Sequence, residues 1–434
     1  MVEPNRGRGV RQGGYRSVLS MVVVAWLLRL VVAGFLYREL LDPARDHWHF
    51  GWEVGQLARS IALQHEFGSP LHGWTGPTAM LPPVYAYLLA TVFRFFGLFT
   101  SQSAFIMLAI NGLFSALTCI PIFFSTQRVL GVDAAKYAGW AWAFYPYAIY
   151  FSVGRVWDYA LTTLMLAFCF WAAQGLPGRG GWISWLGFGV LWGAAALVNP
   201  GVLAAFPFLL ALAATKLAKG AGARLAYSLV AVLGVVLVMV PWMVRHYVRM
   251  GIVCPIRDNF WMEFWAGNTG DLSDLVPDWA HPSTSPVEME KFRSEGEVNY
   301  IAHKRELALQ FLRQRPGLFL ALTARRIAYY WTGYWSFQPA YLGREPTALP
   351  NLLFCTALTI VMLRGVYRWW RRDREAVIPY IVMIAAFPLV YYITHPLMDY
   401  RQAIEPYVVV LMIAGWYSFH GKREALSRRD AVEA

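Results

Sequence analysis

The stretch from Asp46 to Glu53 gathers ionisable side chains directly after the first apolar segment of the chain. Asp46, His47, His49 and Glu53 all lie in it, and Arg59 follows. Ionisable groups at a membrane boundary need water, a partner or a function. A partly desolvated carboxylate has a raised pKa and can accept a proton from an attacking hydroxyl. These residues therefore predict acid–base chemistry on a substrate that arrives along the bilayer, with Asp46 and Glu53 as candidate catalytic groups.

Simpler explanations for this stretch remain open. Asp46 is also a residue type that caps helices. His47 and His49 are compatible with a divalent metal ion, but such histidines more often make hydrogen bonds at the interface. We expect His47, His49 and Arg59 to contact substrate, and metal dependence stays open.

A second carboxylate occurs in the short segment from Arg155 to Asp158, between two apolar runs. Asp158 is either an N-cap for the following helix or an acid that faces the same cavity and pairs with Arg155. The functional reading makes both residues part of the substrate site.

Three arginines are candidates for holding a lipid phosphate, because the planar guanidinium can bind phosphate through two parallel hydrogen bonds. They are Arg245, Arg257 and Arg401. For Arg245 the alternative is a side chain that snorkels to the headgroups. For Arg401 the alternative is an ion pair with Asp399 or Glu405.

Four more polar residues follow the apolar runs and have amide, carboxylate or imidazole groups suited to a polyol. They are Asn259, Glu263, Asn268 and His395. For Glu263 and Asn268, as for Gly267 beside them, an ordinary polar loop is an equally good explanation.

The composition indicates that membrane-spanning helices position these residues. The chain has 434 residues, 57% of them hydrophobic and 15% charged, whereas a soluble protein has about 25% charged residues. Mean hydropathy is +0.40. Runs of about 20 apolar residues span a bilayer. We predict an all-α polytopic membrane protein with about ten spans, at 17–36, 103–126, 134–152, 157–174, 182–198, 200–216, 225–247, 350–367, 376–394 and 403–420.

Loop charge sets the predicted topology. The net charge of +12 falls mostly in short loops, where Lys and Arg mark the cytoplasmic side. The basic loops alternate cleanly only if 80–99 and 317–337 lie on the outer surface as juxtamembrane helices. Both termini are then cytoplasmic, and all candidate site residues share the outer face.

The resulting domain scheme has five parts, together with one catalytic outer loop at 37–102. They are a basic tail (1–16), an N-terminal membrane module (17–247), an outer loop with an interfacial helix (248–349), the last membrane helices (350–420) and a cytoplasmic tail (421–434). We expect 270–300 to be a mobile loop over or beside the site. A disulfide between Cys254 and Cys355 is left open.

Several of these motifs resemble known families. Asp46-His47-Trp48-His49-Phe50-Gly51 is similar to the Asp-Glu-x-His-Phe-Gly stretch of protein O-mannosyltransferases and to the Asp-Glu-x-Arg-Tyr stretch of bacterial aminoarabinose transferases that modify lipid A. Pro82-Pro83-Val84-Tyr85 resembles their following Pro-Pro pair, and Arg155 to Asp158 resembles their second acidic motif. Arg401 to Pro406 is similar to a basic-then-Glu-Pro pattern in related bacterial proteins. His47 stands where those families have Glu.

The resemblance implies the GT-C fold and an inverting glycosyltransferase that uses a polyprenyl-phosphate sugar, of undecaprenyl or dolichyl type. It places the catalytic base at Asp46 and the enzyme in a membrane, with a bacterial inner membrane as the expected location. A ligase or polymerase that uses diphosphate-linked glycans is an alternative, as is a lipid or solute transporter. The sequence contains no glycine-rich phosphate-binding loop after a strand, so nothing in it indicates nucleotide binding.

Overall fold

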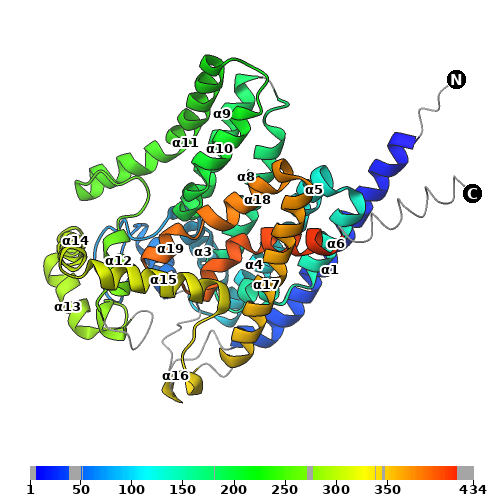
Figure 1. Ribbon diagram of the computed structural model, residues 1–434. Coiled ribbons are helices and arrows are strands. Elements are labelled where there is room, and N and C mark those ends of the chain that lie inside the picture. The colour runs from blue at the N-terminus through cyan, green and yellow to red at the C-terminus, as the bar shows by residue number, and fades with distance from the viewer. Residues whose placement is uncertain are drawn as a thin grey trace, which may run out of the picture.

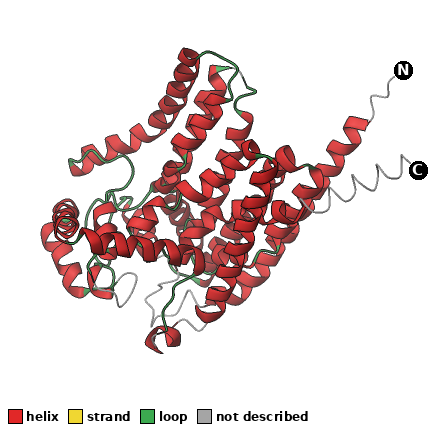
Figure 2. Ribbon diagram, in the orientation of Figure 1, coloured by secondary structure: helices red, strands yellow, loops and turns green. Residues whose placement is uncertain are grey.

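A computed structural model describes residues 6–38, 50, 52–179, 181–270, 277–337, 339–344 and 348–417. Within these residues the chain is helical and has no strand, only one isolated bridge between Gly68 and Pro77. Figure 2 shows helices joined by loops throughout. The predicted all-α class is therefore confirmed.

Each of the ten predicted spans is helical, although several are broken once. The helices are α1 (Arg6–Leu36), α4 (Ser101–Leu117) with α5 (Cys119–Leu130), α6 (Val132–Ala143) with α7 (Pro146–Val153), α8 (Tyr159–Gly175), α9 (Trp182–Val198), α10 (Phe206–Thr215), α11 (Ala221–Met250), α17 (Ala348–Arg372), α18 (Arg374–Ala386) with α19 (Leu389–Ile393), and a last helix over 405–417. Short 3-10 turns precede α10 (Pro200–Ala204) and the last helix (Met398–Ile404).

Five helical segments in the described chain are long and apolar enough to cross a membrane: Arg16–Leu36, Ser101–Leu130, Ala221–Met250, Ala348–Arg372 and Arg374–Ile393. The shorter apolar helices include α8, α9 and α10. This is a helical membrane architecture, and the number of ten spans stays a prediction.

Small residues let neighbouring helices approach closely. A Cβ on Gly189 of α9 would lie 1.9 Å from the carbonyl oxygen of Ala231 in α11. A Cβ on Gly365 of α17 would lie 1.9 Å from the carbonyl oxygen of Leu411 in the last helix. Helix pairs in membranes use glycine in this way because backbone contact replaces the hydrophobic driving force.

The predicted catalytic outer loop is itself helical. It contains α2 (Trp52–Gln64) and α3 (Pro83–Phe96), which pack against each other and build a second hydrophobic cluster with α4. Pro82 and Pro83 begin α3, where proline suits the first helical turn. The segment predicted to lie on the outer surface at 80–99 is thus α3.

The predicted outer loop at 248–349 is mostly helical rather than extended. It contains α12 (Phe260–Gly267), a 3-10 turn (Asp278–Ala280), α13 (Pro286–Glu295), α14 (Glu297–Gln314), α15 (Pro316–Thr332) and α16 (Pro339–Arg344). Figure 1 shows α15 running crosswise to α17, with α12, α13 and α14 grouped at its start.

One expectation for this region needs correction, and one open alternative receives an answer. The described part of 270–300 is largely helical rather than a loop, because it contains the 3-10 turn, α13 and the start of α14. Cys254 and Cys355 are both buried and free, so they form no disulfide. Helix α11 also runs past the proposed boundary at 247 and ends at Met250, where Gly251 adopts the left-handed conformation.

Candidate functional site

The predicted catalytic stretch of the first outer loop is described only at its end. Asp46, His47 and His49 lie outside the described residues, so their predicted roles stay predictions. Glu53 is described and stands in the first turn of α2. A carboxylate there interacts favourably with the positive end of the helix dipole.

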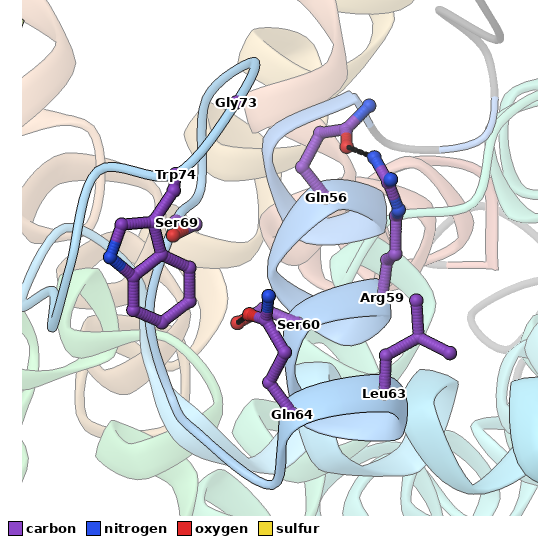
Figure 3. Close-up of a pocket in the computed structure, with 8 residues that line it drawn as sticks. All are labelled: Gln56, Arg59, Ser60, Leu63, Gln64, Ser69, Gly73 and Trp74. Atoms are coloured by element: carbon purple, nitrogen blue, oxygen red, sulfur yellow. Dashed lines mark hydrogen bonds between the residues drawn. The ribbon is translucent and has the colours of Figure 1, made fainter.

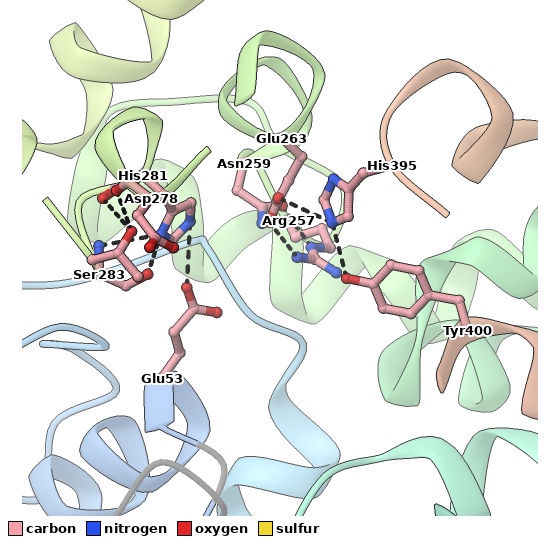
Figure 4. Close-up of polar contacts among 10 residues, drawn as sticks. Glu53, Arg257, Asn259, Glu263, Asp278, His281, Ser283, His395 and Tyr400 are labelled. Atoms are coloured by element: carbon pink, nitrogen blue, oxygen red, sulfur yellow. Dashed lines mark hydrogen bonds and ion pairs between the residues drawn. The ribbon is translucent and has the colours of Figure 1, made fainter. Parts of the chain in front are cut away.

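Glu53 points into a polar cluster that also includes residues of the outer segment 257–281 (Figure 4). Its side chain is 13% exposed, and its Oε1 lies 3.6 Å from Nε2 of His281. Burial raises the pKa of Glu53 to about 8, the Glu263 carboxylate adds to the rise, and Arg257 opposes it. Glu53 therefore holds a proton at neutral pH more often than an ordinary glutamate.

Arg257, Asn259 and Glu263 form a connected chain of hydrogen bonds at the start of α12. Arg257 Nε donates to Asn259 Oδ1 at 2.7 Å, and Asn259 Nδ2 donates to Glu263 Oε1 at 2.9 Å. Arg257 Nη2 lies 4.0 Å from the same Glu263 oxygen. Apart from this ion-pair contact, the two terminal nitrogens of Arg257 make no hydrogen bond within the described chain, so both can donate to a ligand.

His395 and Tyr400 bring the turn before the last helix to the same cluster. His395 Nε2 lies 3.1 Å from the Tyr400 hydroxyl and 3.8 Å from Glu263 Oε2. The Tyr400 ring stacks on Tyr391, with ring centres 4.5 Å apart. Burial, followed by the charge of Arg326, lowers the pKa of His395 to about 4. His395 is therefore neutral at physiological pH.

His281 is a member of the cluster that the sequence did not indicate. The backbone N–H of Ser283 donates to His281 Nδ1 at 3.1 Å. Because Nδ1 accepts that bond, neutral His281 carries its hydrogen on Nε2, which faces Glu53. Burial lowers the pKa of His281 and favours this neutral form. The one signal in the sequence that could have indicated His281 is its position in the polar region 270–300, which we expected to lie beside the site.

Asp158 is near the cluster but has other partners than expected. Its Oδ2 accepts hydrogen bonds from Thr162 at 2.9 Å and from Asn199 at 3.0 Å. Arg155 forms its ion pair with Asp399, at 2.9 Å, and not with Asp158. Asp158 still feels the charge of Arg257. It also precedes α8, but its side chain makes no capping bond there.

The other two arginines are engaged elsewhere. Arg245 donates to the backbone carbonyls of Thr78 and Phe67 and stacks on Trp242. Arg401 forms an ion pair with Glu405, and both side chains are 0% exposed. The structure thus brings Arg257 alone of the three into the Glu53 cluster.

Two further candidates also lie outside the cluster. Asn268 donates to the carbonyls of Phe264 and Ile393 and accepts a hydrogen bond from Arg326, so it joins α12 to α15 and to the end of α19. Arg59 is exposed, donates to Gln56 Oε1 at 3.4 Å, and lines a separate cavity beside α2 (Figure 3).

The described residues contain no group of three or more His, Cys, Asp or Glu side chains arranged to hold a metal ion. Asp46, His47 and His49 precede Glu53 and fall outside that search. Metal dependence therefore stays an open alternative that depends on this stretch.

Comparisons with known proteins define the fold. No family model and no curated protein matches the chain. The oligosaccharyltransferase of Archaeoglobus fulgidus in its apo form is similar over 96% of this chain and 52% of its own, with 13% identity and a TM-score of 0.53. The same archaeal enzyme, AglB, in complex with an inhibitory peptide and a dolichol-phosphate gives 14% identity, 95% and 52% coverage and a TM-score of 0.51.

A weaker likeness relates 90% of the chain to 77% of ArnT from Cupriavidus metallidurans bound to undecaprenyl phosphate, with 15% identity and a TM-score of 0.40. The chain spans about half the length of the archaeal enzyme. The two archaeal comparisons define the fold alone: the chain has the GT-C fold, as the sequence motifs predicted.

Proposed function

We propose that this protein is an inverting glycosyltransferase that moves a sugar from a polyprenyl-phosphate donor to an acceptor at the outer face of a membrane. The observation that carries the proposal is the position of Glu53 and Arg257. A buried carboxylate and an arginine with an open fork share one polar cluster, and the fold around them is GT-C.

The chemistry is a single displacement at the anomeric carbon. An acceptor hydroxyl attacks that carbon, the bond from carbon to the phosphate oxygen breaks, and the polyprenyl phosphate leaves with the bonding electrons. The hydroxyl proton goes to a carboxylate. Asp46 is the proposed base, and Glu53, seven residues further on at the start of α2, shares the role or positions the acceptor.

Arg257 stabilises the departing phosphate in this scheme. Negative charge accumulates on the phosphate oxygens as the bond breaks, and a preorganised donor pair lowers the energy of that state. Asn259 accepts a hydrogen bond from Nε of Arg257 and donates in turn to Glu263, and this chain of bonds orients the two terminal nitrogens of Arg257. Arg245 and Arg401 have structural partners, so we omit them from the phosphate site.

The lipid part of the donor explains why the site belongs to a membrane protein. The archaeal neighbour was solved with a dolichol-phosphate, which supports a polyprenyl phosphate as partner here. The prenyl chain would enter from the bilayer between apolar helices, while the sugar reaches the cluster. The acceptor would arrive from the aqueous side. A bacterial inner membrane with both termini cytoplasmic is part of the proposal.

A donor comparison tests the proposal. Purified protein would be given sugars linked to polyprenyl monophosphate or diphosphate, and the released lipid phosphate would be measured. We expect release from a monophosphate donor by wild type, a loss of at least about tenfold in Arg257→Lys, which keeps the charge but not the fork, and no loss in Arg249→Lys, whose partner is the surface residue Glu66.

Two outcomes of this comparison contradict the proposal. Release from diphosphate donors alone would identify a ligase or polymerase of diphosphate-linked glycans. Binding of both lipids without any cleavage, followed by their movement across vesicle membranes, would identify a transporter.

A further inference from the structure

A cavity beside α2 lies outside the Glu53 cluster and takes no part in the chemistry described so far. It holds about 180 Å³. One wall is the helix face with Gln56, Arg59, Ser60 and Gln64, and the other is the following loop with Trp74. In Figure 3 the Trp74 indole stands across from Gln64 and Ser60.

The lining suits an uncharged polyhydroxylated ring. Amide groups both donate and accept hydrogen bonds, as sugar hydroxyls do, and an indole offers a flat apolar face for the C–H side of a sugar. Gln64 accepts a bond from Ser60 at 3.2 Å through Oε1, and its amide nitrogen makes none within the described chain. The lining includes no carboxylate and a single cation, Arg59, so charge is a minor part of the recognition.

Trp74 is exposed, yet the loop that holds it is fixed at several points. Its side chain is 55% exposed. Ser69 N donates to Gly76 O at 2.8 Å, Thr75 N donates to Ser69 Oγ at 3.0 Å, and Arg293 of α13 donates to the carbonyl of His72 at 2.9 Å. The loop therefore holds an exposed indole beside the cavity, where its flat face is available to a ligand.

The backbone of this loop also carries strain. His65 and Ser69 adopt left-handed conformations, with φ of 57° and 54°, although neither is glycine. Such conformations cluster at ligand-binding segments. Gly68 fits against Gly76 only without a side chain, because a Cβ would lie 2.4 Å from the Gly76 carbonyl oxygen.

The cavity lies along the same helix, α2, that carries Glu53 at its start. Gln56, Ser60 and Gln64 follow Glu53 by three, seven and eleven residues, so all four lie along one side of the helix. Eleven residues of α-helix rise by about 16 Å. A sugar bound between Gln64 and Trp74 therefore lies about 16 Å along α2 from Glu53, a distance that a glycan of several sugar residues spans.

We propose that this cavity is a subsite for one uncharged sugar residue of a glycan whose other end reaches Glu53. The part of this inference that brings the glycan to Glu53 rests on the proposed function. The binding of a sugar in the cavity is independent of it. The glycan is either the acceptor or a donor with more than one sugar, and the same ring chemistry serves both.

Binding measurements on the purified full chain test the inference. Calorimetric titrations would use a panel of methyl glycosides and disaccharides, polyprenyl-phosphate sugars, and polyprenyl phosphate without sugar. The variants are Trp74→Ala and Gln64→Leu. The matched control is Trp182→Ala, which removes a tryptophan that is 58% exposed at the start of α9, remote from the cavity in the sequence.

We expect saturable binding of at least one saccharide by wild type and by Trp182→Ala. Binding should weaken about tenfold in Trp74→Ala, which corresponds to about 1.4 kcal/mol, because the sugar loses its contact with the indole face. Gln64→Leu should weaken it as well, whereas a tryptophan that only anchors the loop in the interface would leave Gln64 without effect. If the variants lose binding only of free saccharides, the glycan in the cavity is the acceptor. If they lose binding of the polyprenyl-phosphate sugar, it is the donor.

The inference is overturned if wild type binds no saccharide in either form, or if Trp74→Ala and Gln64→Leu bind as wild type does. Polyprenyl phosphate without sugar separates this result from the proposed function. If it binds to all variants equally while saccharides fail, the transferase proposal stands and the subsite falls. If it fails to bind while Trp74 is needed for saccharides, the donor proposal falls and the subsite stands.

Discussion

Glu53 is the residue whose chemistry the structure defines most closely. Its carboxylate is enclosed by the start of α2, the Arg257 segment and His281, and burial raises its pKa to about 8. A carboxyl group with that pKa changes protonation state in the range where an enzyme works. It is therefore the group through which pH would control the site.

Replacing Glu53 by Gln should remove a pH-dependent limb of the activity. If its carboxylate accepts or positions the acceptor proton, transfer by wild type rises with pH up to about 8. Glu53→Gln should be slower and lack that limb, which initial rates across a pH series would reveal. The same limb in both proteins would show that another group titrates.

The raised pKa of Glu53 also affects the stability of the fold. The contribution of Glu53 to stability is complete below the unfolded pKa of 4.5 and is lost as pH rises through about 8.

His281 should tune Glu53 without touching the donor. Its Nε2–H faces the carboxylate at 3.6 Å and favours the charged form. His281→Ala should raise the pKa of Glu53 and so move the rising limb of the pH profile of transfer to higher pH. His303→Ala, which removes an exposed histidine paired with Glu295, is the control and should leave the profile in place. An unshifted limb in His281→Ala would assign His281 to packing only.

At the scale of elements, one contact set joins three segments beneath the site. Glu297, at the start of α14, accepts hydrogen bonds from Thr78 Oγ1 and from the backbone N–H of Ala79, both at 2.6 Å. The N–H of Asp258 donates to the carbonyl of Ala79 at 3.0 Å. Asp258 directly follows Arg257, so this contact set links the loop after α2, the arginine segment and α14.

Asp258 and Glu297 also bond to each other through their side chains, and burial raises the pKa of both. Such a pair is most stable with a shared proton. Because the pKa values are raised in the folded state, the stability they contribute is present at low pH and is lost as pH rises through them. Wild type should therefore melt at lower temperature at about pH 8 than at about pH 5.

Asp258→Asn should flatten this dependence, because the amide keeps a hydrogen bond to Glu297 and removes one titrating group. Thermal unfolding in detergent across that pH range would measure it. Asp133→Asn, at an exposed position of α6 beside Lys136, is the control and should melt as wild type does. Equal slopes for wild type and Asp258→Asn would contradict a shared proton.

At the scale of the whole molecule, the structure gathers the predicted outer turns at one end. Asp158 contacts Asn199, Arg155 contacts Asp399, and Glu263 lies near His395, although these residues are far apart in the sequence. Alternating apolar helices with short connections require this result, because every second turn returns to the same side. The topology then predicts that α13 and the loop after α8 lie on opposite sides of the membrane.

Accessibility labelling would test that arrangement. All four native cysteines are buried, so background labelling should be low. Glu290→Cys on α13 should react with a membrane-impermeant maleimide from outside, and Arg179→Cys should react only after permeabilisation. Outside labelling of both positions would contradict the topology.

The sequence predicted the architecture because apolar run length and loop charge act over short stretches of chain. It also selected Glu53, Arg257, Asn259, Glu263 and His395, which the fold brings together. It could not separate Arg257 from Arg245 and Arg401. All three are arginines next to apolar runs, and only tertiary contacts gave two of them structural partners.

The same limit explains the errors in the outer segment. Polar residues between 270 and 300 indicated a loop, but the Ser285 hydroxyl accepts a bond from the N–H of Glu288 and begins α13. His281 was missed because its role depends on Glu53, which is 228 positions earlier in the chain. Long-range contacts of this kind leave no periodic pattern in the sequence.

The most direct test of the central claim is release of free polyprenyl phosphate from a panel of polyprenyl-phosphate sugars, with and without candidate acceptors, by wild type and Asp46→Asn. The account predicts release by wild type with at least one sugar and its loss in Asp46→Asn at unchanged expression. Full activity in Asp46→Asn would contradict the role of Asp46 as the base. No release by wild type with any sugar and acceptor would contradict the transferase itself.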